Sequence, residues 1–428
     1  MRKPLRALLD TLLFPPMPRY NSSMNAICLI FDRLHVGYLG AYGNLWIETP
    51  AVDRLASEAC VFDQAWIDSP RLESLYRSYW RGRHALCPDL PADRSPTLPA
   101  LLRDAGVSTA LLTDERIVAR HPLATDFDEL IEIDPPWQAQ GAPEIEQTHF
   151  ARCFVQMIDW LESAQGPFLL WCHLAGLATS WDAPPAFRRA YWEEGDPQPP
   201  ASAEVPEKML PKDYDPDEVW GFCQAYAGQV SLLDTCIAAL LEFLRSGPAG
   251  SETLLVLTSA RGFPLGEHQR IGPCDEALYS ELGHLPLLLR FPDRSAATFR
   301  SQALVEPADL WATLLDWWAI AGHASSPTAG SLLPIVRQEV QTLRDRLCIA
   351  GQGIQRAIRT PAWYLRTADE PELYAKPDDR WDVNNVAIRC QEVVGCLLDA
   401  LVQYEQTVQR GRISDLPPLN EVLLRGLE

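Results

Sequence analysis

The sequence lacks two features that would place it in large structural classes. No two of its 11 cysteines stand in a Cys-x-x-Cys spacing, and they are scattered over all 428 residues. Dispersed cysteines of this kind are typical of buried, reduced thiols and not of a disulfide framework or a zinc site. The sequence also has no run of about 18 apolar residues, so no membrane span is predicted.

The chain also has fewer basic than acidic residues. The chain has 37 Lys and Arg against 57 Asp and Glu, which gives a net charge of −20. An acidic protein is repelled by nucleic acid and by anionic membranes, so neither is an expected partner. With 47% hydrophobic residues the chain can bury a large core.

Residues 1–24 are predicted to be an N-terminal extension. They contain basic residues and a short apolar stretch, but Asp10 interrupts that stretch and no small-residue cleavage site follows. This pattern does not indicate a secretory signal, so a cytoplasmic location is expected. Leu5, Leu8, Leu9 and Leu12 are spaced for a short helix, packed on the protein itself or docked on a partner or membrane surface.

From residue 25 to about 321, short apolar stretches alternate with amphipathic ones. This alternation is typical of an α/β fold with a mostly parallel sheet between helices. The predicted strands are 26–31, 108–112, 168–173, 253–259 and 285–290, and the predicted helices are 50–59, 97–104, 148–163, 218–245 and 307–321.

The pattern changes after Pro334. Short strands are predicted at 348–351, 354–359 and 362–366, and a terminal helix at 386–409. We therefore predict a main α/β domain over residues 25–335 and a smaller α+β subdomain over 336–428. Residues 182–217 are rich in proline and acidic side chains, so a long surface excursion is expected there.

The first strand ends in a charged pair, Asp32-Arg33. In open α/β sheets the carboxyl ends of the strands hold the ligand. A carboxylate at the end of the first strand is therefore the natural start of a site, and the arginine next to it decides what kind of site it is.

Taken in order, these segments resemble the sulfatase family of the alkaline-phosphatase superfamily. Residues 40–65, which begin Gly-Ala-Tyr-Gly and continue through Thr-Pro-Ala-Val-Asp-Arg-Leu-Ala, resemble its N-terminal signature. Later pieces resemble the family in the same order: 167–173, 226–234, 258–268, 284–290 and 371–385. The resemblance implies an alkaline-phosphatase/sulfatase-like sheet between helices, with the smaller subdomain at the C-terminus.

The resemblance also implies a calcium site, because active sulfatases hold this ion with oxygen ligands at the strand ends. The family's first strand normally ends in two aspartates, and its late loop normally reads Thr-Ser-Asp followed by His or Asn. Here Asp32 remains, but ligands are lost at Arg33, Ala260 and Arg261. A guanidinium cannot coordinate a metal and repels one. Calcium is therefore expected to be absent, and no other cofactor is predicted.

The family's nucleophile is missing too. Its motif is Cys or Ser-x-Pro-x-Arg, and the Cys or Ser becomes formylglycine. Alignment on Pro70 puts Asp68 at the nucleophile and Leu72 at the activating arginine. Asp68 cannot become formylglycine. A register shifted by one residue would use Ser69 and Arg71 instead, but it breaks the spacing from Pro70 and leaves Ser69 without an activating metal.

These joint losses predict a pseudo-sulfatase, in which the scaffold motifs are readable and no catalytic residue is expected. The first hypothesis is a catalytically inactive homologue with a binding or interaction role. The candidates for a pocket that takes sulfate, phosphate or carboxylate are Asp32, Arg33, Arg71, His173, Arg261 and His268.

Other interpretations remain at this point. The arginines would neutralise Asp32 and Asp68 without binding a ligand, and His173 and His268 would be structural histidines. A metal-independent hydrolase of sulfate or phosphate esters would use Ser69 or Asp68 as nucleophile. A third interpretation is that the chain is a subunit that pairs with an active homologue or with itself. Its 14 Trp, 12 Tyr and 13 Phe permit such an interface.

Overall fold

The computed structural model describes residues 24–88, 95–135, 139–247, 250, 252–275, 277–320, 326, 328–367, 369–411 and 413–426. The helix expected around Leu5–Leu12 lies outside these residues.

The core of the protein is an eight-stranded sheet with the order β10-β2-β9-β7-β1-β5-β3-β4. β7, β1, β5, β3 and β4 run parallel, β2 and β10 are parallel to each other, and β9 is antiparallel to both β7 and β2. The predicted mostly parallel sheet is therefore present. The bounds are β1 Asn25–Phe31, β2 Cys60–Trp66, β3 Ser108–Thr113, β4 Glu129–Glu132, β5 Phe168–Leu174, β7 Thr253–Thr258, β9 His284–Arg290 and β10 Arg300–Val305.

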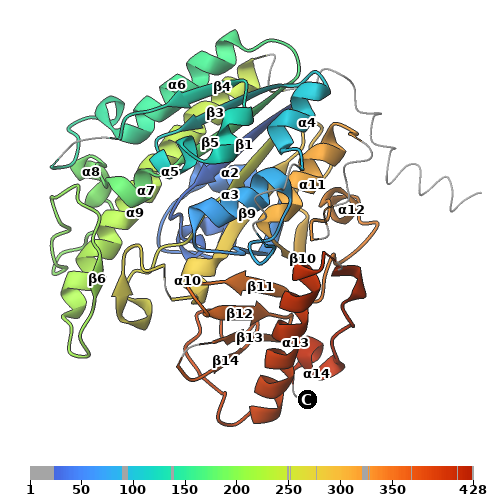
Figure 1. Cartoon of the computed structure of the whole chain (residues 1–428). Helices are drawn as coiled ribbons and strands as arrows, with labels where there is room; N and C mark the ends of the chain where they lie inside the picture. The colour runs from blue at the N-terminus through green and yellow to red at the C-terminus, as the bar shows by residue number, and fades with distance from the viewer. Residues whose placement is uncertain are drawn as a thin grey trace, which may run out of the picture.

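Helices cover both faces of this sheet (Figure 1). Alternate residues of β1 point to opposite faces, so Ala26, Cys28 and Ile30 join one core and the residues between them join the other. The first core packs under α3 (Leu72–Arg81), α4 (Leu98–Asp104), α11 (Pro307–Trp317) and α12 (Leu333–Val336), and the second under α2 (Pro50–Ser57), α6 (His149–Ser163) and α9 (Pro216–Ser246).

Among the residues that the structure describes, one helix is long enough and apolar enough to cross a membrane, and it is α9. Of its most apolar window, 67% is buried inside the fold. Its side chains pack in the same core as α2 and α6. We therefore interpret α9 as a core helix, which agrees with the helix predicted over residues 218–245.

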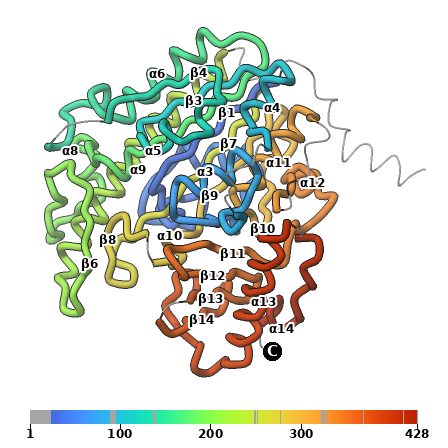
Figure 2. Tube along the Cα trace, viewed as in Figure 1, coloured from blue at the N-terminus to red at the C-terminus, as the bar shows by residue number. Residues whose placement is uncertain are grey.

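The C-terminal part forms an antiparallel sheet, β11-β12-β13-β14, covered by the long helix α13 (Figure 2). Three of its strands were predicted, and the fourth lies in the stretch that only resembled a family tail. The bounds are β11 Leu347–Ala350, β12 Arg356–Arg359, β13 Trp363–Arg366, β14 Glu372–Ala375, α13 Gln391–Gln409 and α14 Glu421–Arg425. The backbone N–H of Ala350 donates to the Asp68 carbonyl at 2.8 Å and ties this sheet to the main domain.

The sequence did not predict β2, β4 or β10. In β2 the polar pair Asp63-Gln64 interrupts the apolar pattern, and the structure places a register shift there, between Phe62 and Ala65. β4 is a four-residue edge strand with mostly exposed side chains, so it has no apolar signal. β10 also carries a register shift, between Ser301 and Leu304. The excursion over 182–217 contains α8 (Pro185–Arg188) and the two-residue β6 (Lys208–Met209).

Candidate functional site

The carboxyl ends of three neighbouring strands meet at one edge of the sheet. Ile30 of β1 lies in register with His173 of β5 and with Thr258 of β7. Asp32, which follows β1, and Arg261, which follows β7, therefore lie at this edge. The backbone N–H of Asp32 extends the sheet pairing to the carbonyl of Leu174 at 2.9 Å.

Arg261 holds Asp32 with a two-pronged ion pair. Its Nε donates to Asp32 Oδ1 at 3.0 Å and its Nη2 to Oδ2 at 2.5 Å, and Asp32 is fully buried. Burial alone would raise the pKa of Asp32, but the charge and hydrogen bonds of Arg261 hold that pKa well below its ordinary value. The expected pairing of Asp32 with an arginine is therefore present, and both carboxylate oxygens are engaged.

A second carboxylate completes the cluster. Asp275 accepts from Arg261 Nη1 at 2.9 Å, and its Oδ1 lies 2.7 Å from Nη2 of the buried Arg33. Burial lowers the pKa of Arg33 and the neighbouring Arg261 adds to this, while Asp32 and Asp275 oppose both effects. Two arginines are thus balanced by two carboxylates, and the second is Asp275, not the Asp68 named in the sequence-based alternative.

The backbone around Arg33 is held in an unusual conformation. Arg33 has φ 68°, in the left-handed region that L-residues other than glycine seldom adopt. The hydroxyl of Tyr226 on α9 donates to the Arg33 carbonyl at 2.6 Å and accepts from the N–H of His35 at 2.8 Å. Ser259 Oγ accepts from the N–H of Leu34 at 3.2 Å. These contacts fix the turn that presents Arg33 to Asp275.

This donor set does not fit the calcium ion that sulfatases normally use. Calcium takes six to eight oxygen ligands. The one carboxylate retained from the family pattern, Asp32, has both oxygens engaged by a guanidinium, and Arg33 and Arg261 bring two positive charges to the same edge. Ala260 offers no side-chain oxygen. No step of a reaction can therefore be derived through calcium at these residues.

Asp68 faces away from this cluster into a buried polar network between the main domain and the C-terminal sheet. Its Oδ2 accepts from Ser78 Oγ and from the N–H of Ala85, the latter at 2.8 Å. Its Oδ1 is buried without a hydrogen-bond partner among the described residues. Burial raises the pKa of Asp68 to about 6, with His84 and Ser78 opposing the rise. A carboxylate placed in this way is not a free nucleophile.

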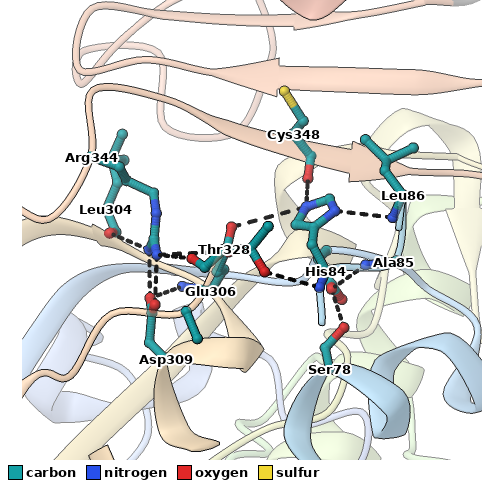
Figure 3. A network of polar contacts seen from close by, with 12 residues as sticks. Ser78, His84, Ala85, Leu86, Leu304, Glu306, Asp309, Thr328, Arg344 and Cys348 are labelled. Carbon is teal, nitrogen blue, oxygen red and sulfur yellow. Dashed lines mark hydrogen bonds and ion pairs between the residues drawn. The ribbon is translucent and has the colours of Figure 1, made fainter. Parts of the chain in front are cut away.

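The network around Asp68 centres on His84 (Figure 3). His84 Nδ1 accepts from the N–H of Leu86 at 3.0 Å, so its Nε2 carries the proton and donates to the Cys348 carbonyl at 2.8 Å. The carboxylate of Glu306 approaches the same ring at 3.9 Å, and 3.7 Å separates it from Arg344. Arg344 itself is engaged by Asp309 through two hydrogen bonds of 2.5 and 2.6 Å.

The rest of the nucleophile segment has structural roles. Ser69 is buried, and its Oγ accepts from the backbone N–H of Arg71 at 3.2 Å, just before α3 begins. Leu72, which stands where the resemblance puts the activating arginine, packs in the first core. Arg71 is exposed. The structure thus brings Arg33 and Arg261 together but leaves the Arg71 side chain out of their ion-pair cluster.

His173 lies beside Asp32 and is buried. Its Nδ1 forms a 2.5 Å hydrogen bond with the hydroxyl of Tyr76, and its Nε2 has no hydrogen-bond partner within the described residues. Burial lowers the pKa of His173 to about 4, and the Asp32 charge only partly opposes this. The ring is therefore neutral at physiological pH and adds no charge to an anion site.

His268 lies at a different contact. Its Nδ1 is 2.9 Å from Glu281 Oε1, its Nε2 is 2.9 Å from the Asp382 carbonyl, and its ring stacks on Tyr279. The Asp382 carbonyl can only accept, so Nε2 donates to it, and the contact of Nδ1 with Glu281 favours the charged imidazole. The hydrogen bond and charge of Glu281 raise the pKa of His268 although burial opposes the rise. His268 therefore joins the late loop to the C-terminal subdomain.

We expect His268 to hold its proton to a higher pH than an unperturbed imidazole does. A folded pKa raised above about 6.5 means that its stabilisation is complete below that pH and is lost as the pH rises through the folded value. An NMR titration of the imidazole should show this, and Glu281→Gln should lower the pKa because it removes the charged partner. His121, whose pKa burial lowers, is the internal control. A His268 pKa at or below that of His121 would contradict the assignment.

The structure also assembles three buried side chains that the sequence did not single out. Ligand atoms of Asp114, His149 and Cys153 lie within 4.8 Å of one another. His149 Nε2 is already 2.6 Å from Asp114 Oδ2, and Asp114 Oδ1 accepts from the N–H of Ala175 at 2.6 Å. Burial raises the pKa of Cys153 well above its ordinary value, which disfavours the thiolate that a metal requires. We interpret the group as a buried Asp–His hydrogen bond.

Asp275 is the site residue that sequence reasoning missed. The sequence did indicate that a second carboxylate was needed, because two arginines, Arg33 and Arg261, were predicted to lie at the same strand ends with only Asp32 to balance them. Which acidic residue would supply the second charge could not be read from the sequence, because Asp275 lies in the irregular segment between β8 (Arg270–Ile271) and α10 (Ser280–Gly283).

Comparisons with known proteins agree on one family. The profile of the family described as Sulfatase matches residues 24–320. Iduronate 2-sulfatase of Mus musculus is 22% identical over 445 residues, which cover 83% of this chain and 76% of that protein.

Solved structures give the same fold. A protein solved in complex with its substrate D-glucosamine-2-N,6-O-disulfate superposes with a TM-score of 0.71 at 19% identity, covering 92% of this chain and 99% of that one. A phosphonate monoester hydrolase from Silicibacter pomeroyi superposes with a TM-score of 0.72 at 17% identity, covering 95% and 100%.

Proposed function

This chain belongs to the sulfatase family, and from that premise we propose that it is a catalytically inactive member that serves a binding or interaction role. It has the family's sheet and strand order. In the proposal it has lost the formylglycine nucleophile and the calcium ion, and with them the family's ester hydrolysis.

The observation that carries this proposal is the ion pair between Arg261 and Asp32. An arginine fork occupies both oxygens of the one carboxylate retained from the family pattern, at 3.0 and 2.5 Å, in a buried site. A fixed guanidinium supplies the positive charge that the metal would bring, but it offers no open coordination position to polarise a substrate or to activate water.

The alternative is a metal-independent hydrolase of sulfate or phosphate esters, and the fold is shared with a phosphonate monoester hydrolase. The geometry favours it less. The Asp68 carboxylate is engaged by Ser78 and Ala85, and the Ser69 hydroxyl accepts from the Arg71 backbone. Both side chains are buried and held by these contacts, so neither is placed as a free nucleophile.

Metal analysis of the purified protein, combined with a turnover assay, tests the proposal. We expect calcium well below one equivalent and no hydrolysis of a generic aryl sulfate or aryl phosphate, with or without added calcium. A stoichiometric divalent ion would overturn the proposal. So would turnover that is lost in the Asp68→Asn/Ser69→Ala variant.

The binding role that we propose involves a small anion or a protein partner. Arg33 and Arg261 are neutralised by Asp32 and Asp275, so their charge serves the fold first. Arg71 is exposed beside Pro70, whose carbonyl accepts from Arg261 at 3.1 Å. Binding of an oxyanion at this edge would therefore depend on Arg71. If the partner is instead another protein or a second copy of the chain, added sulfate would not bind at this site.

A further inference from the structure

A second group of arginines lines a pocket far from the Asp32 edge. The pocket has a volume of about 200 Å³, and Arg54, Arg245, Arg290 and Arg294 line it together with Glu58. Arg290 ends β9 and pairs in register with Leu255, near the start of β7. Asp32 follows the carboxyl end of β1, which is parallel to β7. The pocket thus lies at the amino ends of the parallel strands, and Asp32 lies at their carboxyl ends.

The positive charge in this pocket is not fully balanced. Glu58 is the shared carboxylate, 3.5 Å from Arg54 Nε and 3.4 Å from Arg294 Nη2. Arg245 has its own partner, Glu242, on the same helix. Glu242 is also close enough to Arg54 for the two charges to interact. Four arginines therefore face two carboxylates, in a chain whose net charge is −20.

Arg290 is the buried member of the group. It is 8% exposed, and its Nε has no hydrogen-bond partner among the described residues. Burial lowers the pKa of Arg290, and the neighbouring Arg294 and Arg54 lower it further while Glu58 opposes them. A buried guanidinium with an unmet donor is costly, because each such group loses its hydration without replacement. Arg290 lines the pocket, so an acceptor bound there would supply a partner for its guanidinium.

A simpler explanation accounts for part of the charge. Arg54 and Arg245 lie in the last turns of α2 and α9. The carboxyl ends of two helices together carry about one negative charge, which arginines offset. After that offset, an excess of the order of one positive charge remains in the pocket. The unpaired Nε of Arg290 is not explained by either helix end.

We propose that this pocket binds a tetrahedral oxyanion, a phosphoryl or sulfuryl group that is free or carried on a small molecule. Arginine forks match the oxygens of such groups in both geometry and charge. Drug-sized ligands occupy pockets of about 300–1,000 Å³. A volume of about 200 Å³ suits the anion itself and leaves the remainder of an ester outside. The site is independent of the function proposed above, because it shares no residue with the Asp32 edge.

Calorimetric titration of the full chain with inorganic phosphate, at ionic strength held constant with chloride, tests the site. We expect saturable binding that weakens about tenfold or more when a charge-assisted hydrogen bond is lost. The Arg54→Gln/Arg294→Gln variant tests the exposed arginines, and Arg290→Met tests the buried one. Since Arg290→Met removes a buried side chain, the first variant keeps the proposal falsifiable if the second does not fold.

The control variant is Arg389→Gln/Arg410→Gln, which removes two exposed arginines of the C-terminal part and should bind phosphate like the unmodified protein. Arg71→Gln should do the same, which separates this pocket from any anion bound at the Asp32 edge. Tighter binding of glycerol 3-phosphate than of phosphate would identify an ester as the ligand, and weaker binding the free ion. Phosphate heat no larger than that of added chloride, or binding unchanged in Arg54→Gln/Arg294→Gln, would overturn the proposal and leave the arginines to the helix ends and Glu58.

Discussion

Replacement of Arg261 by alanine should lower the free energy of unfolding by about 3–5 kcal/mol, the range found when one partner of a buried ion pair is removed. The variant leaves Asp32 fully buried with neither of its two arginine hydrogen bonds. It also leaves Asp275 with Arg33 as its partner. Urea unfolding at pH 7, followed by tryptophan fluorescence, measures the change.

Two further variants show whether the loss comes from the stranded charge. Asp32→Asn in the Arg261→Ala background removes that charge and should recover a substantial part of the stability. Arg300→Ala is the matched control, because Arg300 pairs with Asp63 while its own side chain is 46% exposed. Pairs of this exposed kind contribute about 0–1 kcal/mol. Equal losses in Arg261→Ala and Arg300→Ala would contradict a special role for the Asp32 pair.

The second large effect concerns Glu306 and pH. Burial raises the pKa of Glu306 to about 8, although Arg344 opposes the rise. Neither of its carboxylate oxygens has a hydrogen-bond partner among the described residues. A carboxyl with a raised folded pKa stabilises fully below its unfolded value, and that stabilisation is lost as the pH rises through the folded pKa. We therefore expect the free energy of unfolding to fall between about pH 5 and 8, by up to about 1.4 kcal/mol per pH unit.

Glu306→Gln should remove this slope, since glutamine resembles the protonated carboxyl and does not titrate. The variant and the unmodified protein should be similar at pH 5 and below, and the variant should become increasingly the more stable as the pH rises toward 8. His84, whose pKa burial lowers, acts in the opposite sense because its contribution is lost below about pH 6.5. His84 lies 3.9 Å from Glu306, and Asp68, whose pKa is raised to about 6, also responds to the Glu306 charge, so neither contribution cancels in the comparison. Both groups have largely titrated by pH 7, so the slope assigned to Glu306 is measured above pH 7.

The control for Glu306 is Glu421→Gln, because the Glu421 side chain is 80% exposed. Its free energy of unfolding, plotted against pH, should run parallel to that of the unmodified protein from pH 5 to 9. If the Glu306→Gln curve also runs parallel over this range, Glu306 does not titrate within the folded protein in the way that its burial implies.

Much of the fold could be predicted because its centre has a strong apolar pattern. β1, β5 and β7 are buried at every residue, so they read as continuous apolar runs between amphipathic helices. The pattern fails where polar side chains interrupt a strand, as Asp63-Gln64 do in β2, or where a strand is a short exposed edge, as in β4. The antiparallel direction of β9 has no local signal, because its residues are apolar whichever way the strand runs.

The candidate site was predictable only in part. The charge change at Arg33 and Arg261 is visible as soon as the strand ends are known, because both residues follow buried strands. The contacts that decide its meaning come from distant segments. Asp275 arrives from an irregular loop, and the side chain of Asp68 turns toward Ser78 and Ala85 because α3 and the C-terminal sheet surround it. Such placements depend on packing between elements and not on sequence spacing.

The position of β1 in the sheet sets the order in which this protein can be assembled during synthesis. β1 lies between β5 and β7, so its partners begin at Phe168 and Thr253. At a translation rate of about 5–20 residues per second, the second partner follows β1 out of the ribosome after roughly 10–45 s. Throughout that interval a fully buried strand has at least one unpaired edge, which is a template for association with other chains. A holding chaperone that covered this edge until residue 258 had emerged would protect the nascent chain from that association.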